Sequence, residues 1–161
     1  MTSAASTRPR KFDSLEQEAY LNLWRTYDRL RFFEEQLFER HGLTAQQYNA
    51  LRLLRARHPE AIPTLVLAAR LISRAPDITR LVDRLVERGW ASRERIEDDR
   101  RVVQVRITQP GIDLLESLSA EVIECHKRQL GHLSPNELRQ LIALLRAARH
   151  PHEPPDSEWL R

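Results

Sequence analysis

Arginine side chains gather between residues 70 and 106, where they could bind phosphate or read the edge of a base. That segment holds ten arginines and seven acidic residues, an excess equal to the formal net charge of +3 of the whole chain. A guanidinium group is a planar fork of donors that fits a phosphate or a guanine. Lys11 and Lys127 are the only lysines among the 26 basic residues. Codon bias in a G+C-rich genome explains that imbalance at least as well as function does, so the positions of the arginines matter more than their number.

Several of these arginines lie on one face of a predicted helix that begins near residue 78. Its apolar residues recur at the three- and four-residue spacing of a face turned to a core: Ile78, Leu81, Val82 and Leu85. The opposite face is free for function and carries Asp77, Arg80, Arg84 and Arg88, flanked by Thr79 and Asp83. Gly89 follows as a left-handed stop, and Pro76 suits a position in the first turn. Such a helix can enter a groove of duplex DNA.

A two-stranded hairpin is predicted directly after this helix. Residues 90–96 and 102–107 are rich in β-branched or aromatic side chains, and the second segment alternates apolar with polar residues, as a half-buried strand requires. The polar tip between them ends in Asp99, Arg100 and Arg101. Guanidinium groups at the end of a stiff ribbon can reach a narrow minor groove, whose negative potential attracts them. A helix followed by such a hairpin is typical of a winged helix-turn-helix.

The order and spacing of these features resemble the multiple antibiotic resistance regulator (MarR) family of bacteria and archaea. The matching segments are Leu67–Leu71, Ile78–Leu85, Arg88-Gly89, Asp99–Arg101, and Ile107-Thr108 with Gly111. The flanking helices extend the resemblance over roughly residues 12–149. A helix pattern alone is common, but the joint register of helix, glycine, wing motif and Thr-x-x-Gly is specific. The resemblance implies a homodimeric winged-helix regulator whose affinity for DNA is often set by a small ligand or by oxidation.

Three positions depart from the usual pattern of that family. The turn between the two helices of the motif usually holds a glycine and a small capping residue, where this chain has Ile72 and Arg74. Ser73 is nearby and is the candidate for the cap. Asp77 stands where family members often have a serine or threonine facing the bases, so the base preference cannot be carried over. Trp90 replaces the usual leucine and is expected to pack under the wing.

The expected DNA contacts come from the helix and from the tip of the hairpin. Arg80 and Arg84 are the leading base or phosphate contacts of the helix, and Arg100 and Arg101 are those of the wing. Asp99 would orient one wing arginine through a charge-assisted hydrogen bond. The set at or near the groove also includes Arg74, Ala75, Pro76, Asp77 and Thr79. A solvated helix face and an ordinary charged turn explain each arginine about equally well, and the family register is what favours Arg80 and Arg101.

The rest of the chain is predicted to be helical. A first helix over residues 12–40 is apolar on more than one side and therefore needs more than one neighbour. Capping signals open the others: Thr44 with Gln47, Pro63, Thr108, and Ser134 with Pro135 and Glu137. Their expected ends are His58-Pro59, Leu71, Gly131 and His150-Pro151. The segment from Pro151 should not be helical at its start, and Trp159 is expected to dock, with the partner subunit as the candidate surface.

The sequence therefore predicts a mainly α fold with a small β-hairpin wing, in which a winged helix-turn-helix adjoins a helical dimerisation layer. The expected parts are an N-terminal arm (1–11), a single MarR-like domain (12–150) with dimerisation helices (12–40 and 108–150) and a winged lobe (44–107), and a C-terminal tail (151–161). Surplus apolar surface on the helices near both ends would be buried by pairing two copies about a two-fold axis. A homodimer would place two recognition helices in successive major grooves, about 34 Å apart, on a pseudo-palindromic operator.

The family resemblance also implies a repressor that is released by a small ligand, bound between the dimerisation helices and the lobe. Five residues are candidates to line that pocket: Trp24, Tyr27, Phe38, Tyr48 and Arg52. Arg52 would meet an anionic group, and an aromatic or phenolic acid is the first expectation. Aromatic residues at helical spacing are more often core residues, and that alternative stays open.

Cys125 is the only cysteine, and an oxidation-sensing regulator that uses it is an alternative. Family members that sense peroxide usually carry the reactive cysteine near the N-terminus, whereas Cys125 falls late, on an apolar stripe where a buried, inert thiol is expected. A single cysteine permits no intrachain disulfide, which agrees with a reducing compartment. The sequence shows no signal-peptide h-region and no apolar run of about 20 residues. A soluble, cytoplasmic protein, nucleoid-associated when bound to DNA and without a membrane partner, is expected.

Enzymatic and metal functions have no support in the sequence. It contains no phosphate-binding glycine loop, nucleophile motif or zinc signature, and its six histidines form no close pair on one helix turn, so no cofactor is expected. A function of another class stays open, because winged helices sometimes bind proteins and an arginine surface also attracts an acidic partner. Preference for a promoter over random duplex would separate the two.

Overall fold

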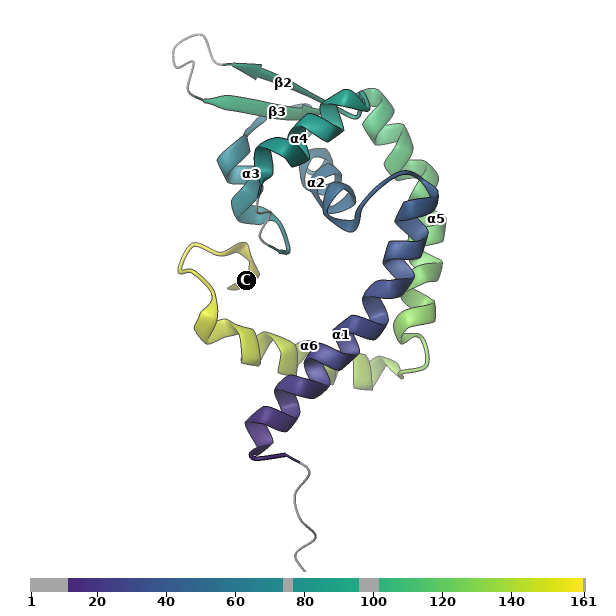
Figure 1. The fold of residues 1–161 in the computed structure, drawn as a ribbon, viewed down its shortest axis with the longest axis vertical. Coiled ribbons are helices and arrows are strands. Elements are labelled where there is room, and N and C mark those ends of the chain that lie inside the picture. The colour runs from purple at the N-terminus through teal and green to yellow at the C-terminus, as the bar shows by residue number, and fades with distance from the viewer. Residues whose placement is uncertain (1–11, 74–76, 96–101, 161) are drawn as a thin grey trace, which may run out of the picture.

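A computed structural model describes residues 12–73, 77–95 and 102–160, and over these ranges the chain is mainly helical with one small sheet (Figure 1). The helices are α1 (Leu15–Arg40), α2 (Ala45–Arg55), α3 (Thr64–Arg70), α4 (Ile78–Glu87), α5 (Gln109–Leu130) and α6 (Pro135–Arg149). The strands are β1 (Ile62–Pro63), β2 (Ala91–Arg95) and β3 (Val103–Ile107), and two short 3-10 turns follow α6: η1 (His150–His152) and η2 (Glu158–Leu160). The predicted fold class is confirmed.

The elements divide into two groups in space. Helices α2, α3 and α4 gather with the sheet at one end of the molecule, and we call residues 44–107 the winged lobe (Figure 1). Helices α1 and α5 pack against each other and run away from the lobe. Helix α6 starts from the far end of α5 and crosses α1 in the view of Figure 1, so that the first turns of α1 extend beyond it. We call α1, α5 and α6 the helical base. The recognition helix and the hairpin are therefore carried at the end of a long helical support.

The core of the lobe is built from the apolar stripes that the sequence predicts. Its large, fully buried side chains include Leu51 and Leu54 of α2, Leu67 of α3, Val82 and Leu85 of α4, and Val105 of β3. Their three- and four-residue spacing on the helices brings each stripe to one side, so three short helices close around one face of the sheet. This packing fixes the orientation of α4.

The sheet has a third strand that the sequence does not predict. Its order is β1-β3-β2, antiparallel throughout, with Ile62 opposite Val105 and Pro63 opposite Gln104. A two-residue strand that ends in proline carries no alternation to detect. Pro63 was expected to open the third helix, whereas it closes β1 and α3 begins at Thr64, whose Oγ1 donates to the carbonyl of Val103 at 3.0 Å.

Side-chain caps define most helix starts. The capping boxes of Thr44 with Gln47 and of Ser134 with Glu137 are both present, as predicted. Hydrogen bonds from Ser134 lower the pKa of the Glu137 carboxyl. The predicted cap of the recognition helix is wrong, because Asp77 rather than Ser73 takes that position. The described helix begins at Ile78, and Pro76, for which a first-turn position was predicted, lies outside the described residues.

The start of the C-terminal segment also differs from expectation. Residues 150–152 form a 3-10 turn that continues from α6, where a non-helical start was predicted. Proline at the second position of such a turn has a compatible φ, and the N–H that it lacks is not needed there. The chain then bends back toward the α3 side of the lobe (Figure 1).

The helical base leaves much apolar surface uncovered in a single chain. The first half of α1 exposes large side chains on several sides: Leu15, Tyr20, Leu23, Trp24 and Tyr27. Over its described length α6 has no buried residue, and Leu144 is 70% exposed. These helices are ordered along their length but lack the neighbours that their apolar faces require.

Candidate nucleic-acid interface

Recognition helix α4 is held by one buried face and ended by a left-handed glycine. Leu81, Val82 and Leu85 are buried in the lobe, as the spacing predicts. Gly89 has a φ of +71°, which confirms the predicted stop. The helix is therefore fixed on its inner side and at its C-terminal end, and its other side is open to a partner.

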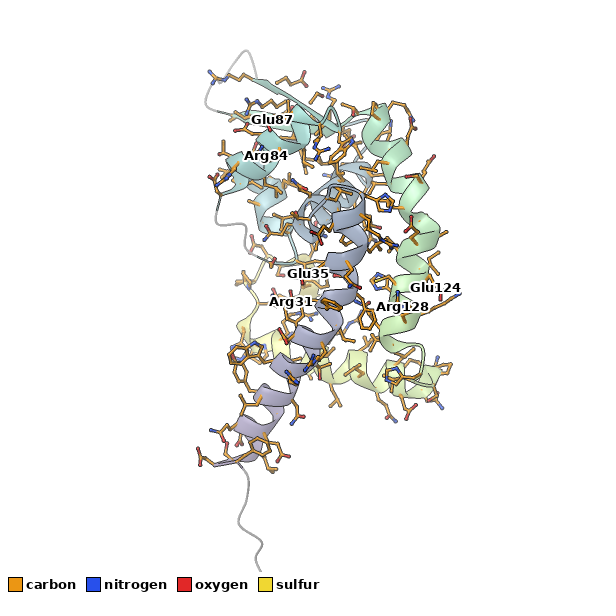
Figure 2. The ribbon with its side chains drawn as sticks, turned by 45° about the vertical axis from the view of Figure 1, so that its right-hand side comes forward. Arg31, Glu35, Arg84, Glu87, Glu124 and Arg128 are labelled. Atoms are coloured by element: carbon orange, nitrogen blue, oxygen red, sulfur yellow. The ribbon has the colours of Figure 1, made fainter. Side chains whose placement is uncertain are left out.

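The open side of α4 presents Thr79, Arg80 and Arg84, all exposed. Arg84 Nη1 lies 3.1 Å from Glu87 Oε2, and Figure 2 shows both side chains on the outer surface of the lobe. Arg80 makes no ion pair with any residue in the described ranges. The Asp77 carboxylate accepts the backbone N–H of Arg80 at 2.9 Å, so its observed role is to cap the helix. A contact between Asp77 and a base stays a prediction.

The base of the wing adds arginines that the sequence reasoning missed. Arg93 and Arg95 share the face of β2 that carries the buried Ala91, since side chains on a strand alternate. Arg93 forms an ion pair with Asp83, which ties β2 to the middle of α4. The two-residue spacing of Arg93 and Arg95 in a predicted strand is the sequence signal that indicates these positions.

Arg88 is exposed, and its guanidinium group contacts two neighbouring parts of the protein. Its guanidinium carbon lies 5.3 Å from the centre of the Trp90 ring, within the range of a cation-π contact. A Cβ placed on Gly42 would lie 3.1 Å from Arg88 Nη2, so the same guanidinium also touches the turn between α1 and α2. Arg88 is thus exposed, as predicted, but its guanidinium group already has contacts within the protein. Trp90 is half-buried at the root of the wing, where it was expected to pack.

The Thr-x-x-Gly motif joins the wing to the helical base. Thr108 Oγ1 donates to the carbonyl of Gly89 at 2.6 Å, and its N–H donates to the carbonyl of Trp90 at 3.1 Å. The same hydroxyl accepts from the N–H of Gly111 and so caps α5. A Cβ on Gly111 would lie 2.2 Å from the carbonyl oxygen of Trp90, which leaves room only for glycine. The motif is thus a close backbone contact between the end of α4 and the start of α5.

Six of the predicted DNA contacts lie outside the described residues. They are Arg74, Ala75, Pro76, Asp99, Arg100 and Arg101. The strands that lead to the wing tip are described, and the pairing of Arg95 with Val103 is their last pair before it. The roles assigned to these six residues stay predictions.

The five residues predicted to line a ligand pocket do not come together within one chain. Phe38 stacks on Tyr48 with ring centroids 4.5 Å apart, and Phe38 is buried in the core. Burial raises the pKa of the Tyr48 hydroxyl, and the nearby charge of Arg52 opposes that shift. Trp24 and Tyr27 lie on the first half of α1, 61% and 63% exposed. Three of the five are therefore neighbours, and the other two face outward.

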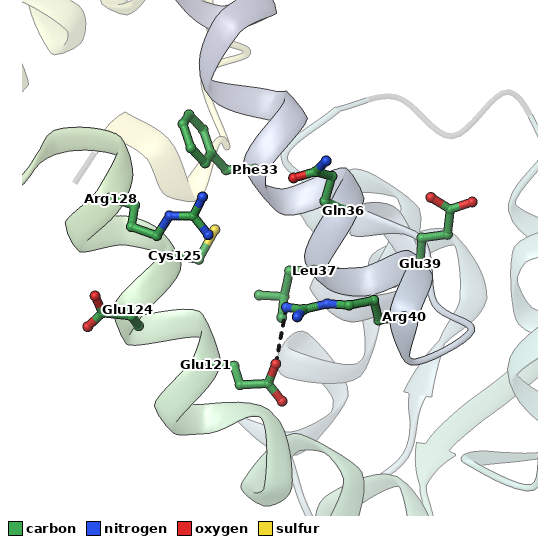
Figure 3. Close-up of a pocket in the computed structure, with 9 residues that line it drawn as sticks. All are labelled: Phe33, Gln36, Leu37, Glu39, Arg40, Glu121, Glu124, Cys125 and Arg128. Atoms are coloured by element: carbon green, nitrogen blue, oxygen red, sulfur yellow. Dashed lines mark hydrogen bonds and ion pairs between the residues drawn. The ribbon is translucent and has the colours of Figure 1, made fainter.

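A separate cavity of about 510 Å³ lies between α1 and α5, as Figure 3 shows. Its apolar side is formed by Phe33, Leu37 and Cys125, and Arg40 and Arg128 lie at its edges. Arg40 Nη2 is 3.2 Å from Glu121 Oε2. Burial raises the pKa of the Cys125 thiol. Cys125 is thus mostly protonated at neutral pH and is a weak nucleophile.

Two negative findings apply to the part of the chain that the structure describes. No group of three His, Cys, Asp or Glu side chains is placed to hold a metal ion. No helix there combines the length and the apolar character that crossing a membrane requires.

The arrangement defines a class of protein. A helix with an exposed arginine face, packed on two further helices and followed by an antiparallel ribbon, is a winged helix-turn-helix of the kind that binds DNA. The model of the MarR family matches residues 43–103. The transcriptional regulator PecS of Dickeya dadantii (strain 3937) is 34% identical over 119 residues, which cover 72% of this chain and 71% of PecS.

Solved structures agree with that match over most of the chain. The MarR transcription factor of Planctomyces limnophilus is 56% identical, with a TM-score of 0.69 over 84% of this chain and 98% of that one. Bordetella bronchiseptica BpsR, whose DNA binding is regulated by 6-hydroxynicotinic acid, is 25% identical, with a TM-score of 0.74 over 86% and 97% of the two chains. The chain belongs to the MarR family. It is therefore a transcriptional regulator with a DNA-binding fold and not an enzyme.

Proposed function

We propose that the protein is a repressor that binds a pseudo-palindromic operator as a homodimer and is released by a small aromatic acid. The observation that carries the proposal is the unit formed by α4 and the wing. Arg80 and Arg84 are exposed on α4, and the ion pair of Arg93 with Asp83 joins that helix to β2. The helix and the ribbon therefore meet a duplex together, the helix in a major groove and the wing tip beside it.

Dimerisation is supported by the apolar surface of the helical base. Exposed large side chains are concentrated on α1 and α6, and α6 has no buried residue over its described length. A helix with this composition is stable when a second surface covers it, and a two-fold pair of bases provides that surface. In the proposal residues 12–40 and 108–150 form the dimer, and residues 44–107 form the winged lobe that it positions.

The proposed effector is an aromatic acid. In support, BpsR, which shares the fold, responds to 6-hydroxynicotinic acid. The cavity between α1 and α5 combines an aromatic ring, Phe33, with two guanidinium groups, Arg40 and Arg128. This cavity lies within the helical base, away from α4. A ligand there would change DNA binding by changing how the dimer places its two winged lobes. Trp24 and Tyr27 are exposed and accessible to a partner subunit, which would have to complete the pocket first predicted.

Selection of bound DNA tests the proposal directly. Purified protein is mixed with sheared genomic DNA of its source, and the retained fragments are sequenced. We expect an inverted repeat whose half-sites lie one helical turn, about 34 Å, apart. A variant with both Arg80→Ala and Arg84→Ala should lose the enrichment while keeping its mass in light scattering. Retention without any shared sequence would overturn the proposal and favour a protein-binding module.

The effector is tested on the operator so obtained. Hydroxylated aromatic acids, including 6-hydroxynicotinate, are titrated against the complex, with the corresponding neutral amides as matched controls. We expect an acid to weaken operator binding about tenfold or more, and its amide to have little effect, because an anionic group would be met by a guanidinium. Equal effects of acid and amide, or none from either, would reject this part of the proposal.

A further inference from the structure

The C-terminal segment after α6 is folded and lies against the winged lobe. Hydrogen bonds within the segment order it: the N–H groups of Ser157 and Leu160 donate to the carbonyls of Pro154 and Ser157, at 2.9 and 3.2 Å. Ser157 Oγ donates to Glu153 Oε2 at 2.7 Å and accepts from the Trp159 N–H at 3.2 Å. The segment therefore keeps a defined shape between α6 and η2.

One end of this segment contacts the first helix of the helix-turn-helix. Arg70, the last residue of α3, places Nη2 3.0 Å from Glu158 Oε1. The two elements line opposite sides of a groove of about 670 Å³, with Leu65 and Ile72 on the α3 side and Trp159 on the other. The contact joins residues 88 positions apart in the sequence, and in Figure 1 the chain end curls back from α6 to the α3 side of the lobe.

Arg149 at the end of α6 also holds the segment, at Glu153 by charge and at Trp159 by an aromatic ring. Arg149 Nε lies 2.9 Å from Glu153 Oε1 without forming a hydrogen bond, so this contact is an ion pair alone. The guanidinium carbon of Arg149 lies 5.1 Å from the Trp159 ring centroid. Trp159 thus contacts its own chain while staying 45% exposed, and the contact with the partner subunit expected from sequence stays a prediction.

These contacts add a link between the base and the lobe. The chain already joins them through the turn before α2 and through Thr108, both on the α5 side of the lobe. The C-terminal segment starts from the end of α6, at Arg149, and reaches the lobe at α3. A body held at two separated points has less freedom to rotate than one held at a single side.

We propose that residues 150–160 form a strap that docks on α3 through Arg70 and Glu158 and limits the rotation of the winged lobe on the helical base. The strap rests on the proposed function in one respect: by limiting rotation it sets the half-site spacing that a dimer accepts. The Arg70 and Glu158 side chains are 24% and 52% exposed, and an ion pair in contact with water is weak, so the strap is a contact that can open and close rather than a fixed joint.

Docking is measured first, without DNA, by hydrogen exchange in the C-terminal peptide. Glu158→Arg should speed exchange of the hydrogen-bonded amides in residues 157–160 about two- to fivefold, the range expected for loss of one ion pair in contact with water. The reversed pair, Arg70→Glu with Glu158→Arg, should restore slow exchange, which a merely structural role of either residue would not. Asp156→Arg is the matched control, since it makes the same change in charge and Asp156 has no ion pair among the described residues.

Spacing is measured next, as the ratio of affinities for two duplexes that differ by one base pair between half-sites. The ratio cancels the general gain in affinity from added positive charge. We expect Glu158→Arg to reduce the preference of the wild-type protein about two- to fivefold, Asp156→Arg to keep it, and the reversed pair to restore it.

The two measurements test different parts of the proposal, and each can contradict its own part. Equal exchange in wild type and Glu158→Arg, or a reversed pair as fast as the single variant, overturns the strap. Strap-dependent exchange with an unchanged affinity ratio overturns its role in spacing. If no variant prefers any duplex sequence, the proposed function fails, and slow exchange that depends on the Arg70 and Glu158 charges still supports the docking.

Discussion

Arg84 is a DNA-contact candidate whose charge is already partly used within the protein. Its partner Glu87 lies one turn further along α4, and both side chains are more than half exposed. An exposed pair at this spacing is worth a few tenths of a kcal/mol, roughly 0.2–0.5. A phosphate or a guanine can therefore take Arg84 away from Glu87, and Glu87 is left facing the negative duplex. The negative charge of Glu87 should therefore lower the affinity of the protein for DNA.

Removing the charge of Glu87 should raise the affinity for the operator. Glu87→Gln keeps the size of the side chain but removes the negative charge, so operator affinity at low salt should rise about three- to tenfold. The slope of log affinity against log salt should become steeper by about 0.9, the value for one further phosphate contact. Titration of labelled operator at several salt concentrations measures both.

A matched pair on α1 serves as the control for this prediction. Arg31 and Glu35 are also close on one helix, with Arg31 Nε 3.7 Å from Glu35 Oε1, and Figure 2 shows them away from the lobe. Glu35→Gln makes the same change in net charge and should leave the salt slope as it is. If Glu35→Gln and Glu87→Gln act alike, the effect is general charge and Arg84 has no direct contact.

Cys125 should behave as an inert thiol. It is buried between α1 and α5, and that burial raises its pKa, so little thiolate is present near pH 8. Iodoacetamide should label it at least about tenfold more slowly in the folded protein than in guanidinium chloride, as followed by mass spectrometry. Rapid labelling of the folded protein, together with loss of operator binding after peroxide, would instead favour the oxidation-sensing alternative.

At the scale of single elements, the cap of α4 is the feature most open to test. Asp77→Ala removes the acceptor for the Arg80 N–H and should lower the free energy of unfolding by about 1 kcal/mol. Asp77→Ser keeps a capping oxygen without the charge and should cost a few tenths at most. Urea denaturation measures both variants. Equal losses would show that the charge of Asp77, rather than its hydrogen bond, supports the helix.

The close contact of Gly111 with the wing gives a second prediction at this scale. Gly111→Ala forces the carbonyl of Trp90 or the first turn of α5 to move and should cost about 1–3 kcal/mol, as overpacking does. Ser119→Ala, on the exposed side of the same helix, should change stability by less than about 0.5 kcal/mol. A stable Gly111→Ala variant would mean that α5 can shift away from the wing at little cost.

The elements differ in how well the sequence predicts them, and the differences have physical causes. Long helices and their caps follow from local spacing, so the helix over residues 109–130 and both capping boxes are found where predicted. Strand β1 depends on pairing with a distant partner and has no local pattern. The sequence predicts Ser73 as the cap of α4 because Ser73 is nearest to the capping position usual in the family. The cap is Asp77 instead, because the length of the turn between α3 and α4 decides which residue precedes the helix.

The candidate site was predictable where it depends on one helix and unpredictable where it depends on contacts between elements. The exposed positions of Arg80 and Arg84 follow from the buried stripe on the other side of α4. The contact of Arg88 with the Trp90 ring and the ion pair of Arg93 with Asp83 depend on where the hairpin folds over the helix. Trp24 and Phe38 lie far apart because α1 is one long, continuous helix. Helical spacing shows which residues share a face, but it does not show how far apart along the helix they lie.

At the scale of the whole molecule, the helical base determines the assembly. Leu144 on α6 is 70% exposed and should lie in the dimer interface. Leu144→Glu would place a charge there and should shift the protein toward a monomer at micromolar concentration, measured by light scattering. The control is Leu65→Glu on α3, since Leu65 is 78% exposed and belongs to the lobe. A dimer with Leu144→Glu, or a monomeric wild type, would contradict the proposed interface.

The ion pair between Asp83 and Arg93 has a practical consequence for altering which operator is bound. Transplanting the α4 sequence of a relative without its hairpin would leave Arg93 facing whatever replaces Asp83, and the ribbon would settle at another angle. The exchangeable cassette is longer, from the cap at residue 77 to Gly111, where the backbone meets that of Trp90. Chimeras cut at those two boundaries should inherit the donor's sequence preference intact, whereas shorter grafts should bind poorly to the operators of both parents.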